Sequence, residues 1–247
     1  MDDEQAHRAR EDGEARALDS EDRMRRFVAD ASHELRTPLT SVMGLAEFYL
    51  LRGGTASRAE VTRLMTGILQ EAARMGRLIA DLLLLARLDE DRPLDTHPVD
   101  LAIVAAEAVR SARAVQPDRP LVLLAAPEPV IVSADAGRLR QIIDNLVSNA
   151  VQHTPAGTPV TVTIAAAPGH GQLTVTYRGP GMSAAQAARV FERFYRTDRA
   201  RNRASGGTGL GLAIAAALVA AHQGTISVDT QPGRGAAFLV QLPLSPA

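Results

Sequence analysis

The sequence predicts an α+β protein: a long helical hairpin that pairs with a second copy into a dimeric four-helix bundle, followed by an α/β sandwich domain. Three features of the 247 residues lead to this prediction. Two apolar stripes with helical spacing lie near the N-terminus, a glycine-containing break separates them, and helical and alternating patterns mix over the remainder. An apolar content of 46% is sufficient for one large or two modest domains with packed cores.

The composition excludes several classes of function. The net charge of −1 provides no basic field for DNA or an anionic membrane, and an aromatic content of 3% is low for stacking on bases, so we expect no nucleic-acid partner. There is no cysteine, which excludes disulfides and thiolate chemistry. No apolar run approaches the roughly 20 residues that span a bilayer, and the acidic N-terminus is unlike a signal peptide.

Residues 1–19 are highly charged and form either a disordered lead-in or the end of a helical connector. Residues 20–91 form the predicted hairpin, with Arg52-Gly53-Gly54-Thr55 between its two helices. Because each helix has one apolar stripe, the hairpin cannot bury both stripes alone, and a homodimer is expected. The stripes are Met24, Phe27, Val28, Ala31, Leu35, Leu39, Val42, Ala46 and Tyr49 in the first helix, and Val61, Leu64, Met65, Ile68, Ala72, Met75, Ile79 and Leu82 in the second.

A second domain, residues 97–247, follows a linker assigned to residues 92–96 in a stretch bracketed by Pro93 and Pro98. An irregular polar stretch is expected to follow the helix at 183–193 and to end at about residue 208. A mixture of helices and strands in this domain favours one sheet covered by one helical layer. The periodicities predict helices at 101–115, 135–153, 183–193 and 209–222, and strands at 121–126, 130–134, 159–166, 172–177, 225–230 and 235–242.

Inside the first helix, His33 lies next to Glu34 and one helical turn before Thr37. A neutral imidazole is a competent nucleophile near pH 7, and Glu34 can orient the ring and stabilise the charge that forms. Pro38 removes the amide that would bond the Glu34 carbonyl, which predicts a bend just below the histidine. For the His-Glu pair alone, an exposed helix histidine beside an unrelated acid is the alternative.

Asn145 and Asn149, at positions i and i+4, place two amides on one face of a predicted helix. The carbonyl oxygen of Asn149 suits Mg²⁺, which prefers oxygen ligands and would take its other positions from phosphates and water. A solvated helix face is an equally good interpretation of such a pair. Gly207, Gly209 and Gly211 precede a helix, whose N-terminal amides favour phosphate, although such a run is also typical of a flexible turn.

Five segments resemble, in order, the motifs of bacterial two-component sensor histidine kinases. Residues 32–39 (Ser-His-Glu-Leu-Arg-Thr-Pro-Leu) resemble the H-box, 135–150 the N-box, 178–182 most of the first glycine box, 190–196 the F-box, and 207–214 the second glycine box. The match covers about residues 20–242, and five motifs in sequence are highly specific. The resemblance implies a dimerisation and phosphoacceptor hairpin followed by a Bergerat-like ATP-binding domain of the GHKL type.

The resemblance also implies the reaction. The γ-phosphoryl group of ATP would pass to His33 and then to an aspartate of a response regulator receiver domain, and the family can also dephosphorylate that regulator. Glu34 would assist the imidazole, Arg36 would orient or neutralise phosphate, and Thr37 resembles the residue that positions water for dephosphorylation. ATP and Mg²⁺ are the implied cofactors, with Asn149 as metal ligand. The implied nucleotide-binding residues are Asn145, Asn149, Gln152, His153, Tyr177, Gly179, Gly181, Phe194, Arg196, Gly207, Thr208, Gly209, Leu210, Gly211 and Leu212. Residues 195–206 resemble the ATP lid of the family. Besides Arg196, this stretch contains Arg199, Arg201 and Arg203, which would contact phosphate in a lid or water in an ordinary basic loop.

Two positions depart from the family pattern. Tyr177 stands where the family has an aspartate that accepts a hydrogen bond from the adenine amino group, and Gln152 stands where a basic residue is common. Loss of a hydrogen bond to a charged partner weakens binding roughly 10- to 150-fold, and the bulk of a phenol adds steric exclusion. Tyr177 therefore keeps a second function open, an ATP-binding-impaired pseudokinase or phosphatase-biased dimeric scaffold. An ATPase of the gyrase and Hsp90 type is a further alternative, against which the histidine hairpin argues. The implied location is the cytoplasm, with a longer parent protein anchored in the bacterial inner membrane.

Overall fold

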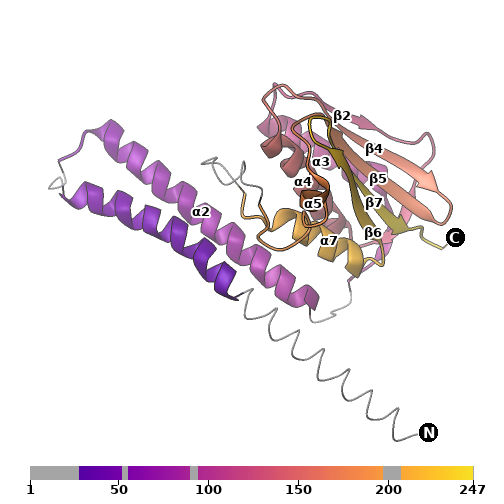
Figure 1. Ribbon diagram of the computed structural model, residues 1–247, viewed down its shortest axis with the longest axis horizontal. Helices are drawn as coiled ribbons and strands as arrows, with labels where there is room; N and C mark the ends of the chain where they lie inside the picture. The colour runs from indigo at the N-terminus through magenta and orange to yellow at the C-terminus, as the bar shows by residue number, and fades with distance from the viewer. Residues whose placement is uncertain (1–27, 52–54, 90–93, 197–206, 247) are drawn as a thin grey trace, which may run out of the picture. The chain divides into compact units, whose positions relative to one another are not determined.

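The computed structural model describes residues 28–51, 55–89, 94–196 and 207–246 (Figure 1). The chain divides into two compact units, residues 1–82 and 83–247. The predicted lead-in at 1–19 and the glycine pair of the hairpin break lie outside the described residues. No helix within the described ranges is both long and apolar enough to cross a bilayer.

The first unit is a helical hairpin. A helix over residues 28–51 runs antiparallel to α2 (Arg58–Asp89), which continues into the second unit (Figure 1). A capping box starts α2: the Glu60 carboxylate accepts from the Ser57 amide at 3.0 Å, and the Ser57 hydroxyl accepts from the Glu60 amide at 3.3 Å. The helices touch where Leu45 approaches Gly67, since a Cβ there would lie 3.0 Å from Leu45 Cδ1.

Much of the apolar surface of this hairpin remains exposed. Leu69 is 69% exposed and Leu51 is 88% exposed. The apolar side chains that the hairpin leaves open also include Leu39, Met43, Phe48, Leu50, Met65 and Ile79. Exposed apolar surface of this kind is typical of an interaction site, and the homodimer stays a prediction.

The second unit contains a five-stranded sheet in the order β2-β4-β5-β7-β6. Strand β2 is parallel to β4, and every other neighbouring pair is antiparallel. The strands are β2 (Leu121–Leu124), β4 (Val160–Ala167), β5 (His170–Tyr177), β6 (Thr225–Gln231) and β7 (Gly235–Pro243). A separate antiparallel pair joins β1 (His97–Asp100) to β3 (Ile131–Ala134).

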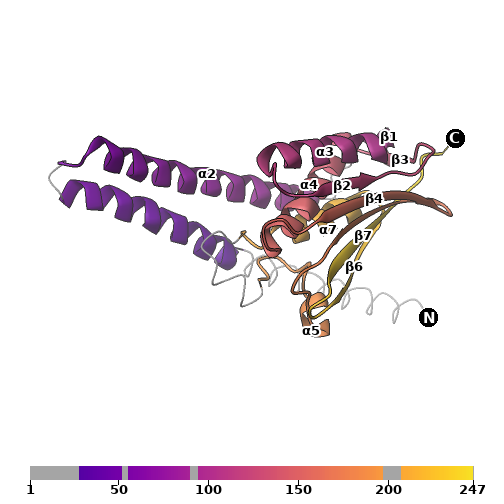
Figure 2. The same cartoon turned by 90° about the horizontal axis from the view of Figure 1, so that it is seen from above.

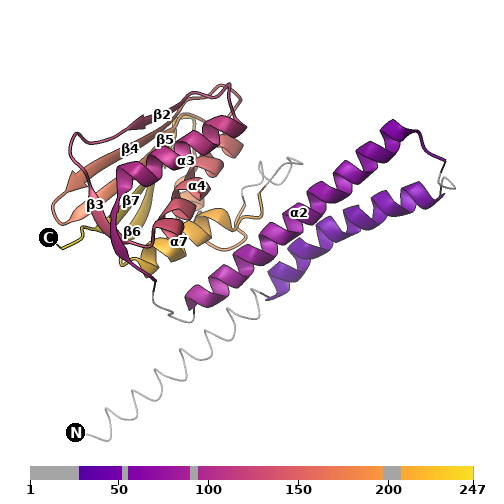
Figure 3. The ribbon, with the colours of Figure 1, turned by 180° about the vertical axis from the view of Figure 1, so that it is seen from behind.

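Three helices cover one face of the sheet: α3 (Leu101–Val115), α4 (Ala136–His153) and α7 (Gly211–Ala221) (Figures 2 and 3). Aspartates cap two of them, because Asp100 accepts from Ala102 N at 2.9 Å and Asp135 accepts from Arg138 N at 3.0 Å. The core between the layers includes Leu139, Ile142, Ile143 and Leu146 from α4, Ile214 and Leu218 from α7, and Val162, Val175 and Phe238 from the sheet. The predicted α/β sandwich is therefore confirmed.

Two elements differ from the prediction. The helix expected at 183–193 is only α5 (Ala184–Ala187), and turns follow it from residue 188. Strand β1 was not predicted because Pro98 resembled part of a linker. Pro98 fits there because β1 has a ladder partner on one side only, so the missing N–H costs no bond.

Candidate functional site

His33 is exposed on the helix 28–51, and Arg36 and Thr37 are exposed beside it, while Glu34 is half-buried. The Thr37 hydroxyl donates to the His33 carbonyl oxygen at 3.4 Å, one turn back. Pro38 is buried, and the helix continues through it. An exposed imidazole on a regular helix is accessible to a large reactant, which is what a phosphoacceptor requires.

The two asparagines of α4 are half-buried and differ in their hydrogen bonding. Asn145 Nδ2 is buried with no hydrogen-bond partner in the described part of the chain. Asn149 Nδ2 donates to the hydroxyl of Tyr177 at 3.4 Å. A buried donor without an acceptor is costly, so Asn145 is a feature that a ligand oxygen would satisfy.

The second glycine segment brings its residues against α4. A Cβ at Gly211 would lie 3.7 Å from Asn145 Oδ1, and a Cβ at Gly207 would lie 3.0 Å from Gln152 Oε1. Helix α7 begins here with Leu210 as its N-cap, and no described side chain caps this end. Thr208 accepts from Leu210 N at 3.3 Å. The start of α7 therefore lies beside Asn145, and its uncapped amides suit an anion.

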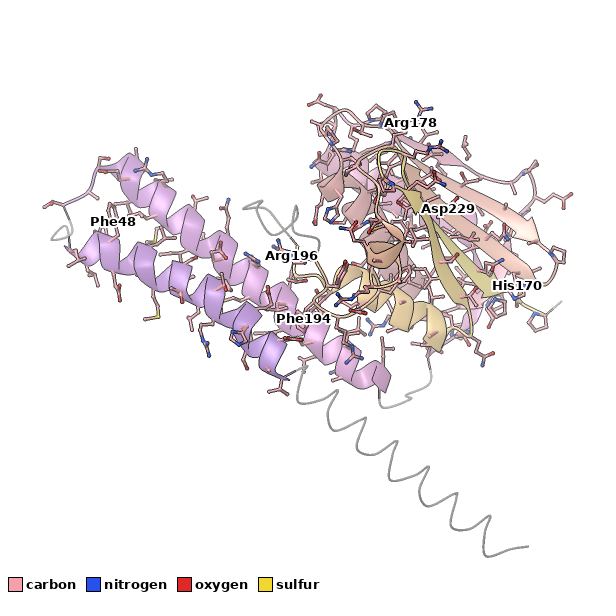
Figure 4. The ribbon with its side chains drawn as sticks, viewed as in Figure 1. Phe48, His170, Arg178, Phe194, Arg196 and Asp229 are labelled. Atoms are coloured by element: carbon pink, nitrogen blue, oxygen red, sulfur yellow. The ribbon has the colours of Figure 1, made fainter. Side chains whose placement is uncertain are left out.

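Gly209 has φ 75°, and a Cβ there would lie 2.9 Å from the carbonyl carbon of Phe194. This close approach joins the two ends of the stretch in which the ATP lid was predicted. Phe194 and Arg196 follow the short α5 region on one side of that stretch (Figure 4). Arg199, Arg201 and Arg203 lie outside the described residues.

The first glycine turn is held by the sheet. Gly181 has φ 60°, and a Cβ there would lie 1.9 Å from Gln231 O. The Pro180 carbonyl accepts from Gly233 N at 2.7 Å, and Met182 N donates to Thr230 at 3.0 Å. Gly181 is thus required for packing against the β6–β7 hairpin.

Tyr177 ends β5 and is 6% exposed, with its ring stacked on Phe238 at 6.4 Å between centroids. Burial raises the pKa of the Tyr177 phenol to about 12, and the hydrogen bond from Asn149 opposes this rise. Phe191, in turn, meets Phe238 edge-to-face at 6.1 Å. The F-box segment, the sheet and α4 are thus connected through one aromatic cluster.

Arg119 holds the C-terminal end of α4, a role that sequence reasoning missed. It is 7% exposed and donates to Thr154 Oγ1 at 2.6 Å, with further bonds to the carbonyls of Val151, Pro155 and Thr158. A cation is favoured at this end of a helix dipole. Because three of its four acceptors are backbone carbonyls, no sequence motif marks the site. Gln152 and His153 lie on the turn that Arg119 holds.

The described residues offer hydrogen-bond donors suited to phosphate but no cluster of charged metal ligands. Among the described residues, no group of three or more His, Cys, Asp or Glu could hold a metal ion. A magnesium site built on Asn149 would therefore depend on phosphate oxygens, which agrees with the preference of Mg²⁺ for few protein ligands. Asn145 Nδ2, which has no partner among the described residues, and the start of α7 would be donors for those phosphates.

Two protein families match the chain. Residues 134–246 match the family described as histidine kinase-, DNA gyrase B-, and HSP90-like ATPase, and residues 23–91 match the His Kinase A (phospho-acceptor) domain. The probable sensor histidine kinase TcrY of Mycobacterium tuberculosis is 48% identical over 225 residues, which are 91% of this chain and 47% of TcrY. The chain thus spans about half the length of this curated relative.

Two solved structures extend the comparison. The mycobacterial sensor histidine kinase MprB is 32% identical with a TM-score of 0.53, over 62% of this chain and 99% of that one. ShkA, solved at full length in complex with AMPPNP, is 32% identical with a TM-score of 0.66, over 87% of this chain and 45% of ShkA.

Proposed function

Because this chain belongs to the family of sensor histidine kinases, we propose that it is a protein-histidine kinase (ATP:protein-L-histidine phosphotransferase) that phosphorylates His33 from ATP. The phosphoryl group would then pass to an aspartate of a response regulator. The observation that carries the proposal is the buried Asn145 Nδ2, which has no hydrogen-bond partner among the described residues and lies in the side chain beside the start of α7, in a chain that also exposes His33.

We assign the phosphate end of the nucleotide to these donors. Asn145 Nδ2 would donate to a phosphate oxygen, and the first amides of α7 would stabilise the triphosphate charge. Asn149 would supply a carbonyl oxygen to Mg²⁺, which neutralises charge on the phosphates when bound. The AMPPNP complex of the related ShkA supports a nucleotide as the ligand.

In the proposed transfer, an unprotonated nitrogen of His33 attacks the γ-phosphorus, and the bond from phosphorus to the bridging oxygen breaks. The electron pair leaves with ADP, and Glu34 stabilises the resulting imidazolium or accepts its proton. Arg36 would balance the charge of the phosphorylated ring. Catalysis of phosphoryl transfer depends mostly on positioning of the reactants and on stabilisation of charge, so these are the main contributions of the protein.

The partners follow from the exposed surfaces of the hairpin. A second copy would cover apolar residues such as Leu69 and Met65, forming the four-helix bundle. A response regulator receiver domain would approach His33, with Thr37 positioning water for dephosphorylation. Attachment of a longer parent protein to the bacterial inner membrane remains a prediction from the resemblance.

A second candidate rests on Tyr177, whose ring occupies the position of the family aspartate. In that case the chain would be an ATP-binding-impaired scaffold or a phosphatase-biased member. Weak nucleotide binding together with preserved regulator dephosphorylation would favour this candidate.

The test uses the purified chain with Mg²⁺ and γ-labelled ATP. The chain should acquire acid-labile, alkali-stable label, and His33→Ala should abolish it because the acceptor nitrogen is removed. His170→Ala is the matched control, since His170 is also exposed but lies at the start of β5. Label that persists in His33→Ala would contradict the assignment, and steady ATP hydrolysis without phosphohistidine would favour the gyrase and Hsp90 type of ATPase.

A further inference from the structure

The Tyr177 side chain bridges the sheet and the helical layer. On β5, Leu173, Val175 and Tyr177 are buried on the same face, so Tyr177 points towards α4. Its ring stacks on Phe238, and its hydroxyl reaches Asn149 Nδ2 at 3.4 Å. The ring edge lies close to the first glycine turn, because a Cβ at Gly179 would be 3.7 Å from Tyr177 Cδ2.

These contacts place the phenol directly beside the amide proposed as the metal ligand. Residue 177 therefore fills the space between the end of β5 and Asn149, beside the first glycine turn. The ring is 6% exposed and has aromatic contact on one face, so it is packed in this place. Vacating it would break the stacking and the hydrogen bond together.

We propose that Tyr177 is an internal occupant of the base end of the nucleotide site and a positioning residue for Asn149. This inference rests on the proposed nucleotide site. The ring excludes a purine from the end of β5, and no carboxylate is present to accept from an adenine amino group. The chain therefore binds a nucleoside triphosphate mainly through its triphosphate and distinguishes adenine from guanine poorly.

The hydroxyl has a separate effect. Because it accepts from Asn149 Nδ2, it engages the donor nitrogen of that amide and not its carbonyl oxygen, and so orients the amide. That oxygen is the atom that Mg²⁺ would take.

The experiment titrates the full chain with Mg-ATP, Mg-GTP and Mg-tripolyphosphate by calorimetry, and measures His33 labelling in parallel. The unmodified protein should bind ATP and GTP within about threefold of each other, and tripolyphosphate should compete with both, since the phosphates dominate. Tyr177→Ser should tighten ATP at least about tenfold by opening the base end, and Tyr177→Asp should prefer ATP over GTP by about tenfold or more, the value of a hydrogen bond to a charged acceptor. If Tyr177→Asp does not fold, which circular dichroism reports, Tyr177→Ser still decides the matter.

Tyr177→Phe isolates the hydroxyl because it keeps the ring. The ATP to GTP ratio should stay the same, while the Mg²⁺ concentration for half-maximal binding should rise about threefold or more, consistent with losing about one neutral hydrogen bond. A purely structural tyrosine would leave this Mg²⁺ dependence unchanged.

The outcomes separate this inference from the proposed function. A strong ATP preference in the unmodified protein, with His33 labelled and Tyr177→Ser without effect, would overturn the role of Tyr177 and leave the kinase assignment intact. Absence of nucleotide binding in all four proteins would overturn both. Unchanged Mg²⁺ dependence in Tyr177→Phe would overturn the positioning role of the hydroxyl.

Discussion

Replacing Gly209 by alanine tests whether the close approach of two backbone segments shapes the nucleotide site. Gly209 has φ 75°, and the added Cβ would lie 2.9 Å, 3.0 Å and 3.1 Å from the carbonyl carbon, Cα and carbonyl oxygen of Phe194. Gly169, in the β4–β5 turn, also has φ 75° but has no atom within 4 Å of its Cβ position. The two glycines thus share a backbone conformation and differ in their surroundings.

The magnitudes follow from this difference. Alanine in the left-handed region costs about 1–2 kcal/mol, and both variants bear this cost. Gly209→Ala also requires the Phe194 backbone to move, and overpacking of this kind costs about 1–3 kcal/mol more. We expect a loss in the free energy of unfolding of about 1–2 kcal/mol for Gly169→Ala and about 2–5 kcal/mol for Gly209→Ala.

Function should separate the variants more clearly than stability. Gly209 lies two residues before the start of α7. Gly169 lies next to His170 at the start of β5, whereas Arg178 and the first glycine turn follow the other end of that strand (Figure 4). Mg-ATP affinity by calorimetry should therefore fall about tenfold or more in Gly209→Ala and change less than about twofold in Gly169→Ala, a tenfold change being about 1.4 kcal/mol. Urea unfolding supplies the stabilities. Equal losses of stability and affinity in the two variants would refute the reasoning that contact with Phe194 positions this turn.

Three further predictions concern other parts of the chain. The pKa of Tyr177 is raised to about 12, so the unfolded state loses this proton first, near pH 10, and stability should decline between pH 10 and 12. The loss is at most about 3 kcal/mol, and urea titrations should show it shrinking in Tyr177→Phe; an unchanged alkaline slope would contradict it. Arg119→Met leaves buried carbonyls without a donor and should cost about 2–4 kcal/mol in urea unfolding, against less than about 0.5 kcal/mol for the exposed Arg110→Met; similar losses would count against the capping role. Thr37→Ala should slow decay of a phosphorylated receiver domain while His33 labelling persists, and equal loss of both would deny Thr37 a separate role.

The helical hairpin, the asparagine pair and the start of α7 could be predicted because each follows from a local sequence pattern. Two apolar stripes at helical spacing predict the hairpin, since packing of one helix face requires that period. The spacing of Asn145 and Asn149 puts both amides on one helix face, and the glycines at 207–211 mark the start of α7. Such features depend on residues within one or two turns of each other.

Pairings between distant residues were decided by the tertiary structure. Tyr177 meets Asn149 across 28 positions, and Arg119 meets Thr154 across 35. Strand β1 was missed because Pro98 looks like a linker until β3 lies beside it. These contacts depend on how the sheet and helices pack, which no local period encodes.

The sequence by itself therefore determined the family, the order of its two units and the identity of the phosphoacceptor candidate, because these are written in short-range spacing. The sequence also revealed that Tyr177 replaces an aspartate. Only the tertiary structure decided where that ring lies, since its packing on Phe238 and its bond to Asn149 join three elements that are remote along the chain.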